Sequence, residues 1–223
     1  MKELPKVIYV MGPPGAGKGT QAEKLAKEIG YHRFSTGDAF RAMARQDTPL
    51  GRKVNEIIHG KGKLMPGEDA AAVVIDAVKK FVSEDKGLIF DGTPRTIIEA
   101  NIIDDFFKEE GYGRPLAILL DVDKEDMIAR NTKRRFCLGI DNDFPVVGEE
   151  DEKRCAELGG RVDMREDDKP EKITTRWEEF MNKTYPVIEQ YEKEGILYRV
   201  DGTKSIEDVH KQVKQMIEGL RRD

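Results

Sequence analysis

A glycine-rich turn between a buried strand and a helix constrains the fold of this chain more than any other segment. Residues 6–11 (KVIYVM) form a short apolar run that predicts a strand. The turn GPPGAGKGT (residues 12–20) follows, and a helical pattern continues to Ile29, where Gly30 ends it. Glycines at this spacing let successive backbone N–H groups turn inward around a phosphate chain, at a helix N-terminus that adds partial positive charge. The segment therefore predicts a phosphate-binding loop, in which Lys18 reaches the outer phosphates.

Three later apolar runs repeat the pattern of a buried strand followed by a helix. They lie at Leu88–Phe90, Leu116–Val122 and Ile196–Val200, each bounded by Gly, Pro or charged residues. Strands that alternate with helices predict a parallel sheet covered on both faces. We therefore expect a doubly wound α/β domain with a five-stranded parallel sheet. A closing amphipathic helix is predicted over Ser205–Leu220, with an apolar face made of Ile206, Val209, Val213, Met216 and Leu220.

Composition narrows the functional classes. The 223 residues suffice for one domain with small inserts, and the formal net charge of −5 argues against a general grip on a nucleic-acid backbone, which needs a basic face. The sequence shows no signal-peptide pattern and no apolar run of bilayer-spanning length, so we expect a soluble, cytoplasmic protein that binds neither nucleic acid nor membrane. Its two cysteines, Cys137 and Cys155, are too few for a disulfide framework, which favours free thiols or the remnant of a metal site.

Two stretches interrupt the alternation of strands and helices. Ser35–Met65 is helical but broken by Pro49 and Gly60, and Arg135–Glu166 is rich in glycine and acidic residues without sustained periodicity. Both are interpreted as inserts on the α/β core. The second is longer than an ordinary connection in a compact domain, which favours a functional lid.

The loop GPPGAGKGT resembles the phosphate-binding loop of adenylate kinases, in which a glycine and a threonine follow the lysine. Five further segments are similar to that family in the same order, and together they span nearly the whole chain. These segments are Ser35-Thr36-Gly37-Asp38 with Arg41, Lys63-Leu64-Met65-Pro66, Asp91-Gly92-Thr93-Pro94-Arg95-Thr96, Arg165-Glu166-Asp167-Asp168 and Asp201-Gly202-Thr203-Lys204. The resemblance implies a monomer with a core of residues 1–34, 67–134 and 167–223, a monophosphate-binding insert at 35–66 and a lid at 135–166.

The same resemblance implies a role for each matching residue. The ATP-binding set would be Gly12, Pro13, Gly15, Ala16, Gly17, Lys18, Gly19, Thr20, Arg130, Arg134 and Lys204. The AMP-binding set would be Thr36, Arg41, Lys63, Met65, Gly92, Arg95, Glu99, Arg165 and Arg176. The catalytic set would be Lys18, Asp91, Arg95, Arg130, Arg134, Arg165 and Arg176.

The chemistry of these residue types fits phosphoryl transfer between two nucleotides. Such a reaction asks a protein mainly to align the two nucleotides and to neutralise phosphate charge, and planar guanidinium groups make bidentate contacts with phosphates. Asp91 ends a buried strand, where a carboxylate can orient waters on Mg²⁺ that is otherwise held by phosphates; the alternative is a cap for the next helix. We expect Mg²⁺ with ATP and no metal ion held directly by the protein.

Three positions depart from the family pattern. Cys137 and Cys155 stand where zinc-type lids place the first cysteine of each pair, but Ile140 and Leu158 occupy the second positions, so structural zinc is not expected. Thr93 replaces an aromatic residue. Glu99 stands where the family commonly has a glutamine that reads the acceptor base, and a carboxylate can only accept hydrogen bonds where an amide also donates. Either Glu99 faces the base, or it turns to solvent on its helix.

The sequence therefore predicts an ATP:AMP phosphotransferase of the adenylate kinase type. Two alternatives stay open: a kinase for GMP, UMP or CMP, and a P-loop nucleotide sensor without catalytic activity. Two opposed sets of arginines argue against the sensor, because a protein that binds one nucleotide needs only one set.

Overall fold

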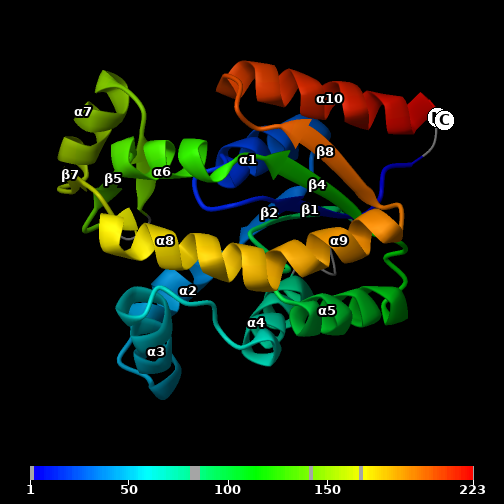
Figure 1. Ribbon diagram of the computed structural model, residues 1–223, viewed down its shortest axis with the longest axis horizontal. Helices are drawn as coiled ribbons and strands as arrows, with labels where there is room; N and C mark the ends of the chain where they lie inside the picture. Colours follow the sequence, from blue (N-terminus) through cyan, green and yellow to red (C-terminus); the bar gives the residue numbers. More distant parts are fainter. Residues whose placement is uncertain (1–2, 81–85, 141–142, 166–167, 223) are drawn as a thin grey trace.

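A five-stranded parallel sheet forms the centre of the molecule (Figure 1). The structure is a computed structural model that describes residues 3–80, 86–140, 143–165 and 168–222. The strand order is β2-β3-β1-β4-β8, and each pair of neighbours runs parallel. The strands are β1 (Val7–Met11), β2 (His32–Ser35), β3 (Leu88–Asp91), β4 (Leu116–Asp121) and β8 (Leu197–Asp201). Because the strands are parallel, the loops after β1, β2, β3 and β4 emerge at the same edge of the sheet.

Alternate side chains of β1 divide the hydrophobic core into two layers. Ile8 and Val10 pack with residues of α1 (Lys18–Ile29), α6 (Lys124–Lys133) and α10 (Ile206–Arg222). Tyr9, from the opposite face of the strand, packs with α4 (Gly67–Lys79), α5 (Ile97–Glu109) and α9 (Tyr185–Lys193). Burial on both faces explains the continuous apolar runs in the sequence. The predicted doubly wound α/β fold is confirmed.

The ends of the predicted helices agree closely with the structure. Helix α1 ends at Ile29, and Gly30 follows in the left-handed conformation with φ of 76°. Helix α10 buries Val209, Val213 and Ile217, whereas Ile206 at its start remains 39% exposed. Of the predicted apolar face, Val209 and Val213 are buried, Met216 and Leu220 are partly buried against the same core, and Ile206 is exposed; the buried Ile217 was not predicted.

One strand of the sheet was missed. Strand β2, with the sequence HRFS, pairs only with β3 and lies at the edge of the sheet. All four of its residues are half-buried. It carries no apolar run, so nothing in its local pattern distinguishes it from a loop.

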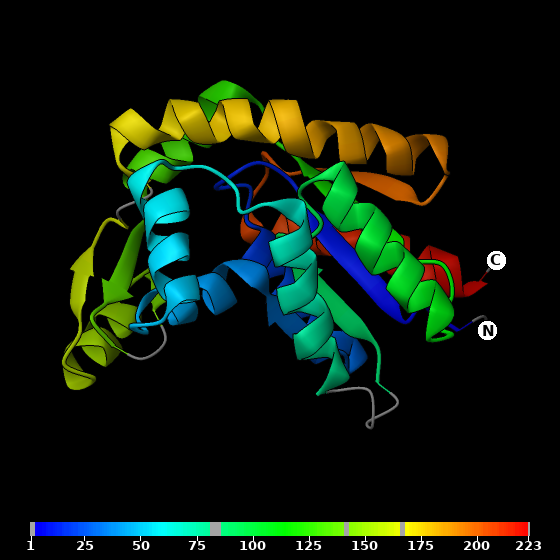
Figure 2. The same cartoon turned by 90° about the horizontal axis from the view of Figure 1, so that it is seen from below.

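Residues 35–66 form a helical layer beside the sheet edge (Figure 2). The elements are α2 (Thr36–Ala44), α3 (Pro49–Val54) and the π-helical turn η1 (Asn55–Gly60). Ser35 and Thr48 cap α2 and α3, each by accepting a backbone N–H three residues later. A separate cluster of buried residues, Phe40, Val54, Met65 and Ala70, joins this layer to α4.

The described residues between 135 and 165 form a small sheet with one helix. This unit projects from the C-terminal end of α6 and the N-terminal end of α8 (Pro170–Glu179) (Figure 1). Strand β5 (Arg135–Leu138) lies between β6 (Phe144–Val146) and β7 (Arg161–Asp163), and both pairings are antiparallel. Helix α7 (Glu149–Glu157) connects β6 to β7. No regular pattern was recognisable in this segment, because strands of three or four residues are too short to show periodicity. Glu166 and Asp167, which belong to the fourth matching segment, lie outside the described residues.

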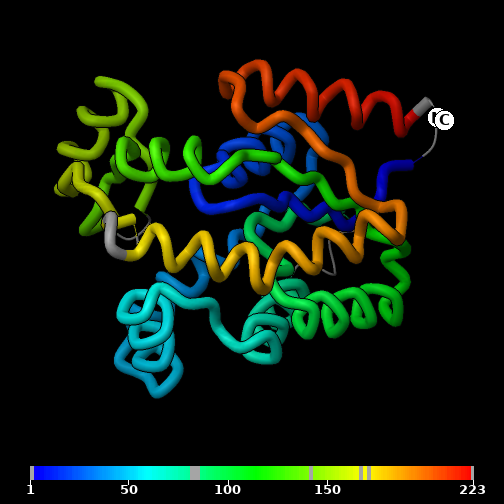
Figure 3. The backbone as a smooth tube through the Cα atoms, viewed as in Figure 1, coloured from blue at the N-terminus to red at the C-terminus, as the bar shows by residue number. Residues whose placement is uncertain are grey.

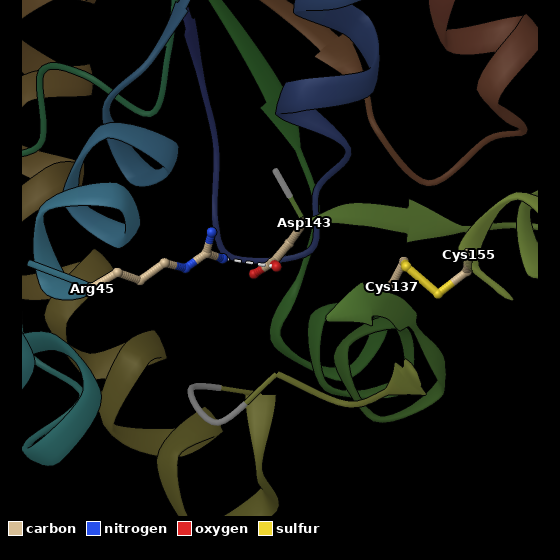
Figure 4. Close-up of a disulfide and its surroundings, with 4 residues drawn as sticks. All are labelled: Arg45, Cys137, Asp143 and Cys155. Atoms are coloured by element: carbon tan, nitrogen blue, oxygen red, sulfur yellow. Dashed lines mark ion pairs between the residues drawn. A yellow bond between two sulfur atoms is a disulfide. The ribbon is translucent and has the colours of Figure 1, made fainter. Parts of the chain in front are cut away.

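Cys137 and Cys155 form a disulfide between β5 and α7 (Figure 4). Their Cα atoms are 5.5 Å apart, and 0% and 1% of the two residues are exposed. The expectation of free thiols or a remnant metal site is therefore wrong. Helix α7 contacts the neighbouring strands β6 and β7, which brings the two thiols together, and each cysteine bonds to the other rather than to a metal ion. Within the described part of the chain, no group of three or more His, Cys, Asp or Glu residues could hold a metal ion.

A long helical run crosses the molecule beside both peripheral segments (Figure 3). It consists of α8 (Pro170–Glu179), the π-helical turn η4 (Phe180–Thr184) and α9. Its first half packs against α6, and its second half contacts α5 and β8. None of the helices within the described residues combines the length and apolarity needed to cross a membrane.

Candidate active site

The phosphate-binding loop lies between β1 and α1, as predicted. Gly15 has φ of 80°, and a Cβ atom there would approach Nδ2 of Asn131 to 2.5 Å. Asn131, on α6 and fully buried, donates from Nδ2 to the carbonyl oxygens of Pro14 at 2.9 Å and Met127 at 2.7 Å. The Asn131 amide therefore holds the loop at Pro14, and only glycine fits against this amide at position 15.

Lys18 lies inside the curve of the loop. Its Nζ donates to the carbonyl oxygens of Gly12 at 2.9 Å and Pro13 at 2.8 Å. Burial lowers the pKa of Lys18 to about 7, the nearby Asp91 opposes that shift, and Arg95 and other arginines reinforce it. The lysine therefore sits in a site that disfavours its own charge until an anion arrives.

Asp91 reaches the same loop from the carboxyl end of β3. Its Oδ2 accepts a hydrogen bond of 2.9 Å from Arg33 on β2, and 13% of its side chain is exposed. A Cβ atom at Gly19 would stand 2.9 Å from Asp91 Oδ2, so the absence of a side chain there lets the carboxylate approach the start of α1. This donor set suits Mg²⁺ held through water, because an oxygen ligand stands beside the phosphate loop.

A cleft opens from the loop toward the 35–66 segment. Lys18, Thr36, Arg41, Arg95 and Arg176 all line it. Met65, Glu99 and Glu179 also line it, and Lys63 lies exposed at its rim. Basic side chains from four separate parts of the chain thus face one space.

Thr36 and Arg41 enter this cleft from α2. The hydroxyl of Thr36 is buried and has no hydrogen-bond partner among the described residues, although buried hydroxyls are nearly always paired. Arg41 is paired with Asp38 one turn earlier on the same helix. An acceptor molecule in the cleft could satisfy the Thr36 hydroxyl.

Arg95 follows β3 in a tight turn. Its Nε donates to the carbonyl oxygen of Gly92 at 2.6 Å, and Thr184 on η4 donates to its carbonyl oxygen at 3.0 Å. The peptide bond between Thr93 and Pro94 is cis. The backbone of this turn is therefore held from two sides, which directs the guanidinium group into the cleft.

Glu99 lies in the wall of the cleft and is only 2% exposed. The alternative in which it turns to solvent is wrong, because α5 is placed with this side chain facing the turn at residues 93–95. Thr93 donates to its Oε1, and the backbone N–H of Arg95 donates to its Oε2 at 2.8 Å. Burial raises the pKa of this carboxyl group, against the lowering effect of its hydrogen bonds.

Asp168 joins two of the predicted arginines. Its carboxylate is 0% exposed; Arg134 Nε donates to Oδ2 at 2.6 Å, and Arg176 donates to Oδ1 at 2.6 Å. The guanidinium groups of Arg134, at the end of α6, and Arg176, on α8, are thereby held side by side. Arg130, one turn before Arg134 on α6, is half-buried and lies outside this cluster.

Arg165 lies over the ring of Phe136, with its guanidinium carbon 3.6 Å from the ring centroid. A second cleft includes Arg165 together with Arg41 and Arg45. Arg45 also donates to the carbonyl oxygen of Ile140 at 3.0 Å and pairs with Asp143 at 2.8 Å, so the 35–66 and 135–165 regions touch directly (Figure 4).

Lys204, predicted to bind ATP, lies in the turn between β8 and α10. Lys204 is exposed and pairs with Asp201 at 3.5 Å, and the same carboxylate accepts the backbone N–H of Thr203 at 3.0 Å. Gly202 donates to the carbonyl oxygen of Asp121, which ties the turn to the end of β4. The turn therefore stands beside the carboxyl edge of the sheet.

Several residues around the site carried no recognisable sequence signal. Asn131, Arg33 and Phe136 act through contacts with residues distant in the chain. Glu179 accepts the backbone N–H of Leu64 at 3.1 Å and Lys183 at 2.8 Å, which connects the 35–66 segment to α8. Asp168 was named only as part of the segment with Arg165. Its role as the partner of Arg134 and Arg176 was not predicted.

A glycine loop that curves around a lysine, with arginines gathered from several helices at its open side, defines a P-loop phosphotransferase. The family model described as adenylate kinase matches residues 10–196. Among similar proteins is an adenylate kinase of Caldanaerobacter subterraneus subsp. tengcongensis, 39% identical over 97% of this chain and 98% of its own length. Another, from Archaeoglobus fulgidus, is 37% identical over 96% of this chain and 99% of its own length. The chain belongs to the adenylate kinase family, and the resemblance seen in its motifs is confirmed.

Proposed function

We propose that this protein catalyses the reversible Mg²⁺-dependent transfer of the terminal phosphoryl group of ATP to AMP, which yields two ADP. One observation carries the proposal: the P-loop lysine and the arginines of the acceptor side line the same cleft. A protein that only bound ATP would have no use for Arg41, Arg95 and Arg176 opposite Lys18. Family membership supports the same activity.

On the donor side, we assign ATP to the P-loop and its surroundings. Lys18 and the backbone N–H groups would bind the outer phosphates, and Thr20 lies in the first turn of α1 next to them. Arg130 and Arg134 would approach from α6, and the turn at Lys204 would receive the adenine. Mg²⁺ bound with ATP would supply positive charge that offsets the charge of the phosphates. Asp91 would orient its water ligands from the end of β3.

On the acceptor side, Arg41 and Arg95 would bind the α-phosphate of AMP. The unpartnered Thr36 hydroxyl, the buried Met65 and Glu99 lie in the cleft wall, and we assign the base to them. Lys63 and Gly92 would contribute at the rim and beneath the phosphate. Arg165 and Arg176 would contact the phosphoryl group in transit, where fixed positive charge is most effective.

We also assign the 35–66 segment as the acceptor insert and the 135–166 segment as a lid. A donor site open to water would hydrolyse ATP, so closure of a lid that carries Arg165 would exclude water and complete the site. The contacts of Arg45 with Ile140 and Asp143 support this assignment, because they already join the two segments beside a cleft. A cytoplasmic monomer is also part of this proposal.

A coupled assay across AMP, GMP, UMP and CMP, with and without Mg²⁺, tests the proposal. Transfer to AMP that requires Mg²⁺ and greatly exceeds transfer to the other three is expected. Preference for another monophosphate would identify the protein as the kinase for that nucleotide, and absence of transfer to all four would favour the nucleotide sensor.

A bisubstrate analogue provides a second test. Two adenosines joined by five phosphates should bind much more tightly than ATP, because the second contact becomes intramolecular. A sensor for one nucleotide would gain nothing from the second adenosine.

A further inference from the structure

One aromatic ring in the 135–165 region contacts two of the arginines assigned to phosphoryl transfer. Phe136 is 5% exposed. The guanidinium carbon of Arg165 lies 3.6 Å from the centroid of its ring, and that of Arg134 lies 5.3 Å away. Both distances fall within the range of cation–π attraction, which extends to about 6 Å. The two arginines belong to different segments, so the ring is a shared support.

The chemistry of this support differs from that of the neighbouring carboxylate. Asp168 holds Arg134 and Arg176 through ion pairs, which offset part of their positive charge. A phenyl ring attracts a guanidinium group through its quadrupole and carries no net charge. Phe136 therefore supports Arg165 without adding a negative charge beside it, so this contact does not offset the charge that a phosphate would meet.

The ring is also fixed firmly to its own segment. Phe136 belongs to β5, the central strand of the small sheet, and faces Pro145 on β6 and Asp163 on β7. The next residue, Cys137, forms the disulfide to α7. A side chain with neighbours on both sides and a covalent link one residue away has little freedom to move, which is the condition for aligning another group to within about half an ångström.

We propose that Phe136 is a positioning residue for phosphoryl transfer: its ring sets the placement of Arg165 and Arg134 at the donor phosphates and the moving phosphoryl group. This inference rests on the proposed function. It adds a residue that contacts neither nucleotide directly and acts through the two arginines. Loss of the ring should therefore lower kcat more than it raises either KM, since correct placement matters most in the transition state.

The competing explanation is that Phe136 only fills the core of the small sheet. The chain offers a matched control, because Phe144 on β6 of the same sheet lies under Arg154, at 4.7 Å from the guanidinium carbon. We assign neither Phe144 nor Arg154 to a nucleotide. Phe144→Leu thus removes a cation–π contact of the same kind from the same sheet and leaves the proposed transfer machinery untouched.

The experiment compares Phe136→Leu, Phe136→Met, Phe136→Tyr and Phe144→Leu with the unmodified protein. For each, kcat, both KM values, the Kd of the adenosine pentaphosphate adenosine analogue and Tm are measured. We expect the leucine and methionine variants at position 136 to lose roughly 3- to 30-fold in kcat, the range that corresponds to one cation–π contact. Affinity for the analogue should fall in parallel. Phe136→Tyr, which keeps the ring, should stay within about twofold of the unmodified protein.

Three results would overturn the inference. The first is a kcat for Phe136→Leu equal to that of Phe144→Leu. The second is a loss in kcat that is explained by the fall in Tm, so that Phe136→Leu and Phe144→Leu show the same relation between kcat and Tm. The third is a tyrosine variant as slow as the leucine variant at unchanged Tm. Absence of transfer in the unmodified protein would instead refute the proposed function, and affinity for the analogue would still report on Arg165 and Arg134.

Discussion

The backbone N–H of Arg95 donates a 2.8 Å hydrogen bond to Oε2 of Glu99. Thr93 donates to the other carboxylate oxygen, and the Glu99 side chain is buried, so it closes the turn that carries Arg95. Thr93 and Glu99 are two of the positions at which the sequence departs from the family pattern. Their contact indicates that the two departures belong together: the threonine hydroxyl serves the carboxylate.

Removal of the Glu99 carboxylate should damage the acceptor side selectively. Glu99→Ala would leave the Arg95 N–H and the Thr93 hydroxyl buried without this partner, at a cost of about 1–3 kcal/mol for each group. Tm should fall, and KM for AMP should rise more than KM for ATP. Glu99→Gln is the matched control, because its amide can accept from Arg95 and also bond Thr93. Equal effects of the alanine variant on both nucleotides would contradict this role.

The same carboxylate gives a pH dependence of stability. Burial raises the pKa of Glu99 in the folded protein, so between its unfolded and folded pKa values the folded state binds more protons. Its contribution to stability is therefore complete below the unfolded pKa and lost as pH rises through the folded one. Denaturant titrations should show the unmodified protein losing stability relative to Glu99→Gln across that window. A constant difference would refute the raised pKa.

Lys18 should take up a proton when ATP binds. Its pKa of about 7 leaves most of the amine neutral near pH 8, whereas a bound phosphate chain favours the ammonium form. Calorimetry in two buffers of different ionisation enthalpy should detect proton uptake at pH 8 and less at pH 6, and affinity should weaken as pH rises above 7. Lys18→Met should abolish the uptake and slow transfer by on the order of 10² or more. Uptake that persists in the variant would have another source.

Asp168→Asn should uncouple Arg134 and Arg176. An amide oxygen accepts a weaker hydrogen bond than a carboxylate, and the half-buried arginine pair would lose the negative charge that Asp168 supplies. We expect a loss in kcat of at least tenfold and a lower Tm. Asp163→Asn, at a residue exposed on β7, is the control and should match the unmodified protein in both measurements. If the two variants behave alike, Asp168 has no role in placing the arginines.

The disulfide should stabilise the small sheet without a metal. It closes a loop of 18 residues, for which chain entropy gives about 3 kcal/mol. A reductant should lower Tm in the unmodified protein and leave a variant with serine at both cysteine positions unaffected. Denatured, unreduced protein should show no free thiol, and its zinc content should be far below one equivalent. Two titratable thiols, or stoichiometric zinc that survives gel filtration, would contradict the pairing.

Local patterns in the sequence were enough to predict the core of the fold. The run before Gly12, the glycine spacing of the loop and the stop at Gly30 each act over a few residues, so the sequence alone specified β1 and α1. Strand β2 escaped because it is a half-buried edge strand. Strands β6 and β7, of three residues each, are shorter than the interval over which a period can be recognised.

Contacts between distant residues account for what the sequence could not supply. The disulfide depends on how α7 packs on the small sheet, and Cys137 and Cys155 by themselves are equally compatible with free thiols. The supports of the site are of the same kind: Asn131 reaches Pro14 across 117 positions, and Arg33 reaches Asp91 across 58. Motifs identified the residues proposed to touch nucleotides. Except for Asp168, which lies in a motif, the residues that hold them were identified only from the three-dimensional packing.

The position of Asp168 bears on when the electrostatic field of the site is created. Without this carboxylate, Arg134 and Arg176 would be two like charges in a space with little water, and their repulsion would grow as a closing lid removed more of it. The buried carboxylate of Asp168 offsets that repulsion. The three side chains together then carry a net charge of one positive unit at a fixed position. The part of the field that comes from Arg134 and Arg176 is thus established when the chain folds, before a closing lid adds Arg165. In bulk water, solvent dipoles would have to reorient during the same reaction. The two arginines need no such reorientation, because their positions are set before either nucleotide binds.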